Sequence, residues 1–182
     1  MDLTIRTAPA ESQPILEGIE ADLGFVPNLA ATAAASPALL AGFDGLRRAV
    51  ATAKVDLVDR EIVGLAVGIV IDNRYGIAFH TTRLATLGVG EDDLAAMRAG
   101  RPPAGSRPAA VYEFARTLAT GRGKVDAAVV DRLTAEGAST ADVLDLVAEC
   151  AFASLVGLVD NLAGGVPLDD FLVPRAWDGA KH

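Results

Sequence analysis

The sequence is poor in cysteine and in basic residues, and each shortage excludes a class of protein. A single cysteine, Cys150, cannot form an internal disulfide, so a reducing compartment is expected and we predict a cytoplasmic protein. Sixteen basic residues against twenty-four acidic ones leave a net charge of −8. A surface this acidic repels phosphate backbones and anionic lipids. We therefore predict neither a nucleic-acid partner nor a membrane partner.

Long hydrophobic runs are also missing. The longest one, Ile62 to Ile71, stops at Asp72, well short of the roughly 20 apolar residues that a spanning helix needs. The N-terminal residues include Asp2 and Arg6 and lack the apolar stretch of a signal peptide. Half of all residues are nevertheless apolar. Part of this hydrophobicity should cover a contact between copies, so we predict a homo-oligomer.

Aromatic residues make up only 5% of the chain, so the core must be built from Ala, Leu and Val. Ala and Leu are strong helix formers, which favours an all-α fold. We predict one all-helical domain over residues 1–182, with "GRPPAGSRP" at 100–108 as a connector and 166–182 as an apolar arm docked on its own or a neighbouring subunit. Helical spacing, caps and breakers predict helices at 14–23, 37–53, 56–72, 75–87, 91–99, 109–120, 126–136 and 140–161.

The candidate site starts from the two histidines. His182 is the last residue, whereas His80 lies within a predicted helix. Asn73, Gly76, His80 and Arg83 follow steps of three, four and three, so they share one helix face. A lone helical histidine is most often a core or surface residue, so its neighbours must decide its role.

The neighbours supply a resemblance. The stretch "DREIVGLAVGIVIDNRYGIAFHTTRLATLGV", from Asp59 to Val89, resembles the central motif of the carboxymuconolactone decarboxylase and alkylhydroperoxidase D-like family. That motif has a Glu on one helix, then a Cys-x-x-Cys pair and a His four residues after the second Cys. Glu61 and His80 match its Glu and His. The lead-in "GFVPNLAATAAASPALLAGFDGL" is similar too, and the likeness covers residues 20–100. It implies the alkylhydroperoxidase D-like helical fold, in an oligomer between dimer and hexamer.

The chain departs from this motif at both cysteines, which are replaced by Asn73 and Gly76. In the peroxidase branch, one thiolate attacks the peroxide and the second resolves the disulfide. An amide and a hydrogen atom can do neither. The resemblance therefore implies the fold and a proton relay without the peroxidase activity, and the decarboxylase branch is the nearer analogy.

Glu61 and His80 alone can still move protons. A carboxylate beside an imidazole fixes its tautomer and gives a general base near neutral pH. Gly76 should leave a gap one turn before His80, with Asn73 offering its amide there and Arg74 or Arg83 anchoring an acidic substrate. We predict cofactor-free proton transfer on a small organic acid or lactone, as in decarboxylation or isomerisation. Direct contact and a bridging water are both open for Glu61 and His80.

Two alternatives remain. Glu61 and His80 can be a buried polar pair that fixes helix packing in a non-catalytic oligomeric binder or scaffold. A weaker alternative is a peroxidase that uses Cys150. This cysteine lies in the apolar stretch "LVAECAFASLVGLV", where a thiol is usually inert, and Glu149 beside it should raise its pKa. We expect no metal site, because the sequence has no metal-ligand spacing. It also has no phosphate-binding glycine loop and no serine nucleophile elbow.

Overall fold

The computed structural model describes residues 4–179. They form nine α-helices and one 3₁₀ helix, η1, and none of the α-helices is long and apolar enough to cross a membrane. The elements are α1 (Gln13–Leu23), α2 (Asn28–Ala33), α3 (Pro37–Val50), α4 (Leu57–Ile71), α5 (Arg74–Thr86), α6 (Glu91–Arg98), α7 (Ser106–Thr120), α8 (Ala127–Ala135), α9 (Thr140–Leu162) and η1 (Asp170–Arg175).

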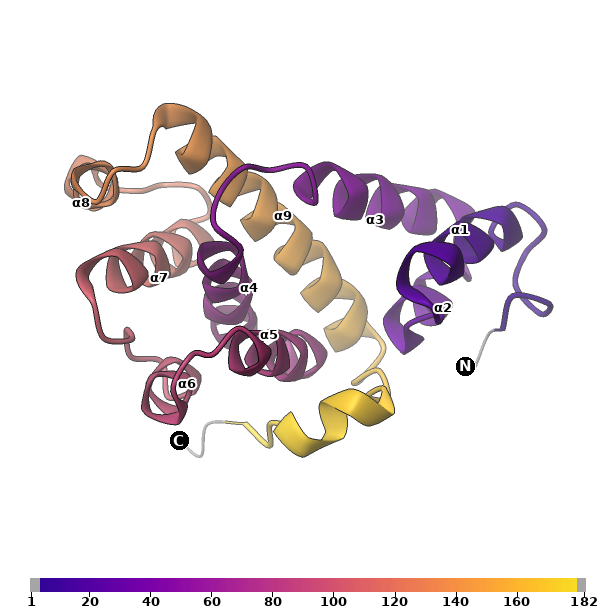
Figure 1. Cartoon of the computed structure of the whole chain (residues 1–182). Coiled ribbons are helices and arrows are strands. Elements are labelled where there is room, and N and C mark those ends of the chain that lie inside the picture. The colour runs from indigo at the N-terminus through magenta and orange to yellow at the C-terminus, as the bar shows by residue number, and fades with distance from the viewer. Residues whose placement is uncertain (1–3, 180–182) are drawn as a thin grey trace.

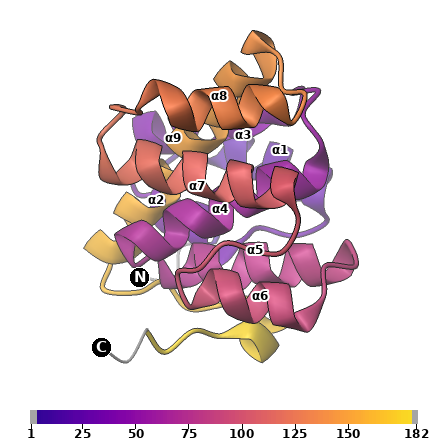
Figure 2. The ribbon, with the colours of Figure 1, turned by 90° about the vertical axis from the view of Figure 1, so that its left-hand side faces the viewer.

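Helix α4 lies at the centre and packs mainly on α5, α7 and α9. Figure 2 shows α8, α7, α4 and α5 one below another, with α6 beneath them. The long α9 runs past this stack and separates it from α1, α2 and α3 (Figure 1). Residues 62–68 of α4 are buried without interruption, as expected for a helix that is apolar on all sides.

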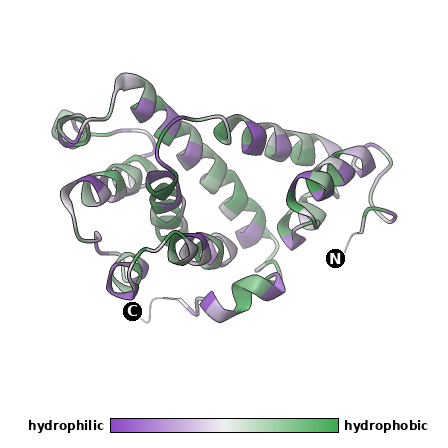
Figure 3. Cartoon of the chain, in the orientation of Figure 1, coloured by the Kyte–Doolittle hydropathy of each residue, from purple (hydrophilic) through white to green (hydrophobic). Residues whose placement is uncertain are grey.

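Two apolar clusters make up the core, and α9 contributes to both. Its N-terminal half places Leu146 and Cys150 in the cluster with α4 and α7, and its C-terminal half places Val156 and Val159 in the cluster with α1, α2 and α3. Apolar residues follow α4 and α9 along their lengths in Figure 3. Helix α9 is therefore shared by both halves of the core.

Local signals set several helix ends as predicted. Ser36 caps α3 by accepting a hydrogen bond from the Leu39 amide, with Pro37 in the first helical position. Asp56 caps α4 by accepting from the Val58 amide at 2.8 Å. Asp59, three residues further along, is buried in an ion pair with Arg107 at 2.7 Å. Asp56 is thus the N-terminal cap of this helix.

One helix was not predicted, and two helix boundaries differ from the predictions by more than one residue. Helix α2 was missed, because Pro27 is extended and only the residue after it begins the helix. Helix α3 ends at Val50 rather than at residue 53. Helix α7 begins at Ser106, inside the predicted connector. Pro108 lies in its first turn, where the amide that proline lacks would have no helical partner.

The C-terminal segment docks on its own chain, so the own-subunit alternative holds for residues 166–179. Leu172 is fully buried, and η1 packs on α5. Arg98 donates to the backbone carbonyls of Arg175 and Ala176, both at 2.9 Å. His182 lies outside the described residues. The segment therefore closes one face of the helix that carries His80.

Candidate functional site

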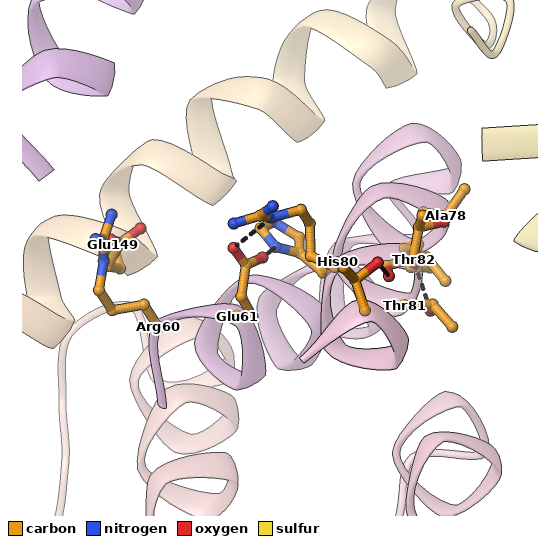
Figure 4. Close-up of polar contacts among 10 residues, drawn as sticks. Arg60, Glu61, Ala78, His80, Thr81, Thr82 and Glu149 are labelled. Carbon is orange, nitrogen blue, oxygen red and sulfur yellow. Dashed lines mark hydrogen bonds and ion pairs between the residues drawn. The ribbon is translucent and has the colours of Figure 1, made fainter. Parts of the chain in front are cut away.

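Glu61 and His80 meet directly across the α4–α5 contact. The His80 Nδ1 atom lies 2.8 Å from Glu61 Oε2, so no water separates them (Figure 4). Both side chains are largely covered, with 10% of Glu61 and 16% of His80 exposed. Of the two arrangements left open by the sequence, the structure has the direct one.

Gly64 is the reason that the imidazole fits between the two helices. It lies about one turn after Glu61 on α4, and a Cβ atom built on it would be 2.1 Å from His80 Cε1 and 2.2 Å from Nε2. The ring therefore rests against bare backbone. Farther along, Gly68 meets Ile77 of α5 in the same way, with the corresponding distance at 3.2 Å. The two glycines allow α4 and α5 to pack closely.

The electrostatics of the pair fix the position of a proton. Burial raises the pKa of Glu61, but the hydrogen bond and charge of His80, together with the charge of Arg83, bring that pKa below its ordinary value overall. Glu61 is therefore ionised at neutral pH, and a carboxylate only accepts hydrogen bonds. His80 Nδ1 must donate, which leaves the lone pair of a neutral ring on Nε2.

The Nε2 atom is open. It makes no hydrogen bond to any residue from 4 to 179, and no buried side-chain nitrogen or oxygen within that range lacks a partner. Nε2 therefore reaches solvent. A base held by a carboxylate on one side and open on the other is arranged for proton transfer with a small molecule.

The remaining predicted site residues divide into two groups. Arg83 joins the pair, since its Nε donates to Glu61 Oε1 at 3.3 Å. Arg74 points the other way and donates to the Trp177 carbonyl at 3.3 Å. The structure thus brings together Glu61, His80 and Arg83, and it places Arg74 against the C-terminal segment.

Asn73 and Gly76 have a local role that differs from the expected gap. Asn73 is 1% exposed and caps α5, where its Oδ1 accepts from the Gly76 amide at 2.9 Å. A Cβ atom on Gly76 would lie 2.3 Å from Asn73 Nδ2, so the Asn73 side chain already fills the space beside Gly76. The expectation of an open gap at Gly76 is wrong, because the residue that replaces the first cysteine folds back over the second position.

Two charged residues near the pair were not among the predicted site residues. Arg60 precedes Glu61 on α4, and its Nε donates to Oε1 of Glu149 on α9. Figure 4 shows this ion pair beside the Glu61–His80 pair, with α9 crossing above α4. Burial raises the pKa of Glu149, Arg60 and His80 lower it, and the charge of Glu61 raises it further. The only sequence signal for Arg60 is its position next to Glu61.

Cys150 has the properties of an inert core thiol. It is 5% exposed, and burial together with the charge of Glu149 raises its pKa to about 12. The direction predicted from the neighbouring glutamate is confirmed. A thiol this weakly acidic is almost fully protonated at neutral pH and is a poor nucleophile.

Two hollows in the described surface lie away from the Glu61–His80 pair. One of about 1070 Å³ is bounded by the N-terminal segment, α1 and α2, and includes Ile5, Arg6 and Phe25. Another of about 270 Å³ lies between Tyr112 and Arg132. Within residues 4–179, no three acidic, histidine or cysteine side chains gather to hold a metal ion. Neither hollow is lined by Glu61 or His80.

The class of fold follows from similar solved structures. The chain is similar to the alkylhydroperoxidase D core of an uncharacterized peroxidase-related protein from Ralstonia eutropha JMP134, with a TM-score of 0.81 and 20% identity over 95% of this chain and 93% of that one. An uncharacterized peroxidase-related protein from Silicibacter sp. TM1040 is similar with a TM-score of 0.74 and 18% identity, over 94% of this chain and 93% of that one. The debrominase Bmp8 is similar with a TM-score of 0.71 and 17% identity, over 91% of this chain and 89% of that one. These likenesses show the alkylhydroperoxidase D-like fold.

A similarity to one protein family comes from the sequence itself. Residues 37–120 match the model of the Carboxymuconolactone decarboxylase family, and this segment contains Glu61 and His80. Over this segment, somewhat less than half of its length, the chain is similar to the carboxymuconolactone decarboxylase family, and it has no cysteine pair. A comparison with curated protein sequences finds no match.

Proposed function

We propose that the protein is a cofactor-free general acid–base enzyme that acts on a small organic acid or lactone. His80 Nε2 takes a proton from a carbon next to a carbonyl, and the Glu61 carboxylate stabilises the imidazolium that forms. In an isomerisation, the same imidazolium returns the proton to another carbon or oxygen. In a decarboxylation no proton is taken from carbon: His80 starts as the imidazolium and gives its proton to the carbanion left after loss of carbon dioxide. The observation that carries the proposal is an ionised Glu61 bonded to Nδ1 while Nε2 is open.

The chemistry proposed for His80 excludes thiol redox steps. Cys150 is the only cysteine, and its sulfur is buried in the core with a raised pKa. A peroxidase reaction needs an accessible thiolate. Proton transfer needs only the imidazole and its carboxylate, both of which are present.

The test uses exchange into heavy water, which needs no knowledge of the final product. Small lactones and 2- and 3-oxo acids are incubated with protein in D₂O, and loss of the proton next to the carbonyl is followed by ¹H NMR. We expect His80→Gln to slow any exchange that the protein catalyses by about 10²-fold or more. Glu61→Gln should also slow it, while Cys150→Ala should leave it unchanged. Equal exchange by the wild type and His80→Gln would overturn the proposal.

The hollow at the N-terminal segment supports a second candidate, a non-catalytic small-molecule binder. Its volume of about 1070 Å³ is large enough for a ligand of ordinary size. Phe25 and Ile5 offer apolar surface there. This candidate predicts ligand binding that Phe25→Ala weakens and His80→Gln leaves unchanged, measured by calorimetry. The opposite pattern would favour the enzyme.

A further inference from the structure

One of the three guanidinium nitrogens of Arg60 donates a hydrogen bond within residues 4–179, and the other two do not. Its Nε donates to Glu149, and this is its one hydrogen bond to residues 4–179. The side chain is 17% exposed. Because no buried side-chain nitrogen of the described residues is without a partner, the two Nη atoms reach solvent. The Nε atom of Arg60 is thus fixed by Glu149, while its two Nη atoms can donate hydrogen bonds to a ligand.

The Glu149 carboxylate aims this fork and keeps it in place. Only 8% of its side chain is exposed, and it comes from α9, so the ion pair joins α4 to α9. A guanidinium that is already fixed loses less conformational entropy when it binds a carboxylate than a freely moving one. Glu149 is therefore a positioning residue for Arg60.

The location of Arg60 connects it to the proton-transfer pair. It is the residue before Glu61, and Glu149 is close enough to His80 and Glu61 for their charges to act on it. Figure 4 shows both ion pairs on the same side of α4. Arg83 also contacts Glu61, but it comes from α5, whereas Arg60 is on α4.

The summed charge of the side chains around His80 permits an anion to bind there. Arg60 and Arg83 are positive, Glu61 and Glu149 are negative, and these four cancel. A substrate carboxylate adds one negative charge, and a proton on His80 offsets it. Binding of an acid and protonation of His80 in the reaction therefore favour each other.

We propose that Arg60, positioned by Glu149, binds the carboxylate of an acidic substrate beside His80, in the role that the sequence suggested for Arg74 or Arg83. The inference rests on the proposed function, because it assumes that the substrate reaches His80 Nε2. It narrows the substrate class to molecules with a carboxylate group a short distance from the carbon that loses its proton.

A binding titration tests this inference without turnover. The full-length chain, labelled with ¹⁵N, is titrated at pH 7 and constant ionic strength with succinate, and separately with succinamide, which has the same shape without charge. We expect succinate to shift the backbone amides of residues 60–64 and 80 in a saturable way, and succinamide to leave them in place. Equal shifts with both probes, or no saturable shift with succinate, would overturn the inference.

Variants then separate recognition by Arg60 from its structural role. Arg60→Gln should weaken succinate binding by about tenfold or more, since it removes a charge-assisted pair of hydrogen bonds. Glu149→Gln keeps an acceptor for Nε but removes a competing negative charge, so succinate should bind roughly threefold tighter. Arg132→Gln is the matched control, because Arg132 also pairs with a glutamate, Glu113, at 2.9 Å on other helices. It should bind like the wild type.

A double variant deals with loss of folding. Arg60→Gln with Glu149→Gln replaces the ion pair by two amides that can bond to each other, so it should keep a melting temperature near that of the wild type and still fail to bind succinate. Binding equal to the wild type in either variant that lacks Arg60 would overturn the inference. Such a result would leave the exchange test of His80 unaffected, and a negative exchange test would not by itself change the succinate titration.

Discussion

Gly64 makes room for the His80 ring, because it has no side chain where the ring packs on α4. The His80 ring occupies the space where any Cβ atom on residue 64 would be. Exchanging a glycine in a helix for alanine normally adds up to about 1 kcal/mol of stability, because alanine loses less backbone entropy. At this position the gain is opposed by a clash with a buried ring.

We therefore expect Gly64→Ala to lower the free energy of unfolding and to slow exchange catalysed by His80. Urea denaturation and the D₂O assay measure the two effects. Gly42→Ala is the control, since a Cβ atom on Gly42 of α3 meets nothing within 4 Å. It should be neutral or stabilising, and activity should stay. A Gly64→Ala protein as stable and active as the wild type would contradict the described contact.

The Glu61 carboxylate gives a dependence of stability on pH. Its folded-state pKa lies below the ordinary value of about 4.3, because His80 and Arg83 outweigh burial. A lowered pKa means that the unfolded chain binds the proton more readily than the folded chain. The stability due to Glu61 is thus present above about pH 4.3 and is lost as pH falls through the folded-state pKa.

Glu61→Gln removes this dependence. We expect the wild type to have the higher free energy of unfolding at pH 7, and the difference from Glu61→Gln to shrink as pH falls below about 4.3. Urea denaturation at several pH values measures the difference. Glu149 titrates in both proteins, so its contribution largely cancels. A difference that stays constant from pH 7 to the acid limb would show that Glu61 has no lowered pKa.

Cys150 allows a direct check on the exclusion of thiol chemistry. Burial and a raised pKa predict that iodoacetamide reacts slowly with the native chain at pH 7.5 and quickly after unfolding. Mass spectrometry of the alkylated protein measures both rates. Rapid labelling of the folded chain would restore the alternative of a peroxidase based on this residue.

At the scale of the helix, Asn73 determines where α5 begins and hence where His80 lies. Its Oδ1 accepts from the Gly76 amide, and its side chain is buried between the start of α5 and the end of α9 near Gly157. Loss of an N-terminal cap costs about 0.5–2 kcal/mol. Asn73 therefore contributes to the site through the helix rather than through a ligand.

The expected result for Asn73→Ala is a loss of stability in this range and faster hydrogen exchange of the Gly76 amide. Ser36→Ala removes the cap of α3, whose side chain accepts from Leu39, and is the matched control. It should cost a similar amount without changing exchange at Gly76. Unchanged exchange at Gly76 in Asn73→Ala would contradict the role assigned to this cap.

The helices were largely predictable because their start and stop signals are local. Ser36 with Pro37, and Asp56 before an apolar run, state a helix start within a few residues. The α2 helix has six residues and no side-chain cap, so it lacked such a signal. Asp160 near the end of α9 has a role that no local pattern indicates: it is buried and accepts from the amides of Tyr75 and Val166.

The site was predictable to the extent that it follows one helix or one motif. The Glu61–His80 pair came from the motif, whereas the contact of Arg60 with Glu149 joins residues 89 positions apart. Such contacts depend on how α9 crosses α4, which no local pattern states. The position of Arg74 against Trp177 has the same origin, because the path of the C-terminal segment sets it.

At the scale of the whole molecule, α9 presents an uncharged outer stripe. Leu144, Val147, Leu158 and Leu162 are exposed and recur at steps that keep to one face of a helix, and Leu162 is 92% exposed. A chain with net charge −8 repels its copies, except where the contacting surface carries no charge. The stripe is consistent with the prediction of a homo-oligomer.

Light scattering measures this self-association. We expect the wild type to have a mass that is a multiple of 18.7 kDa and Leu158→Asp to have a smaller one. Leu23→Asp, at an exposed leucine of α1, is the control and should keep the mass of the wild type. A wild-type mass of one chain would remove the prediction of an oligomer.

The proton position on His80 tests the central claim most directly. Long-range ¹H–¹⁵N NMR spectra at pH 8 distinguish the two ring nitrogens, and a His182→Gln variant identifies the other histidine. A proton on Nδ1, a bare Nε2, and loss of this preference in Glu61→Gln are the predicted results. A neutral ring that carries its proton on Nε2, and that does not respond to Glu61→Gln, would contradict the account.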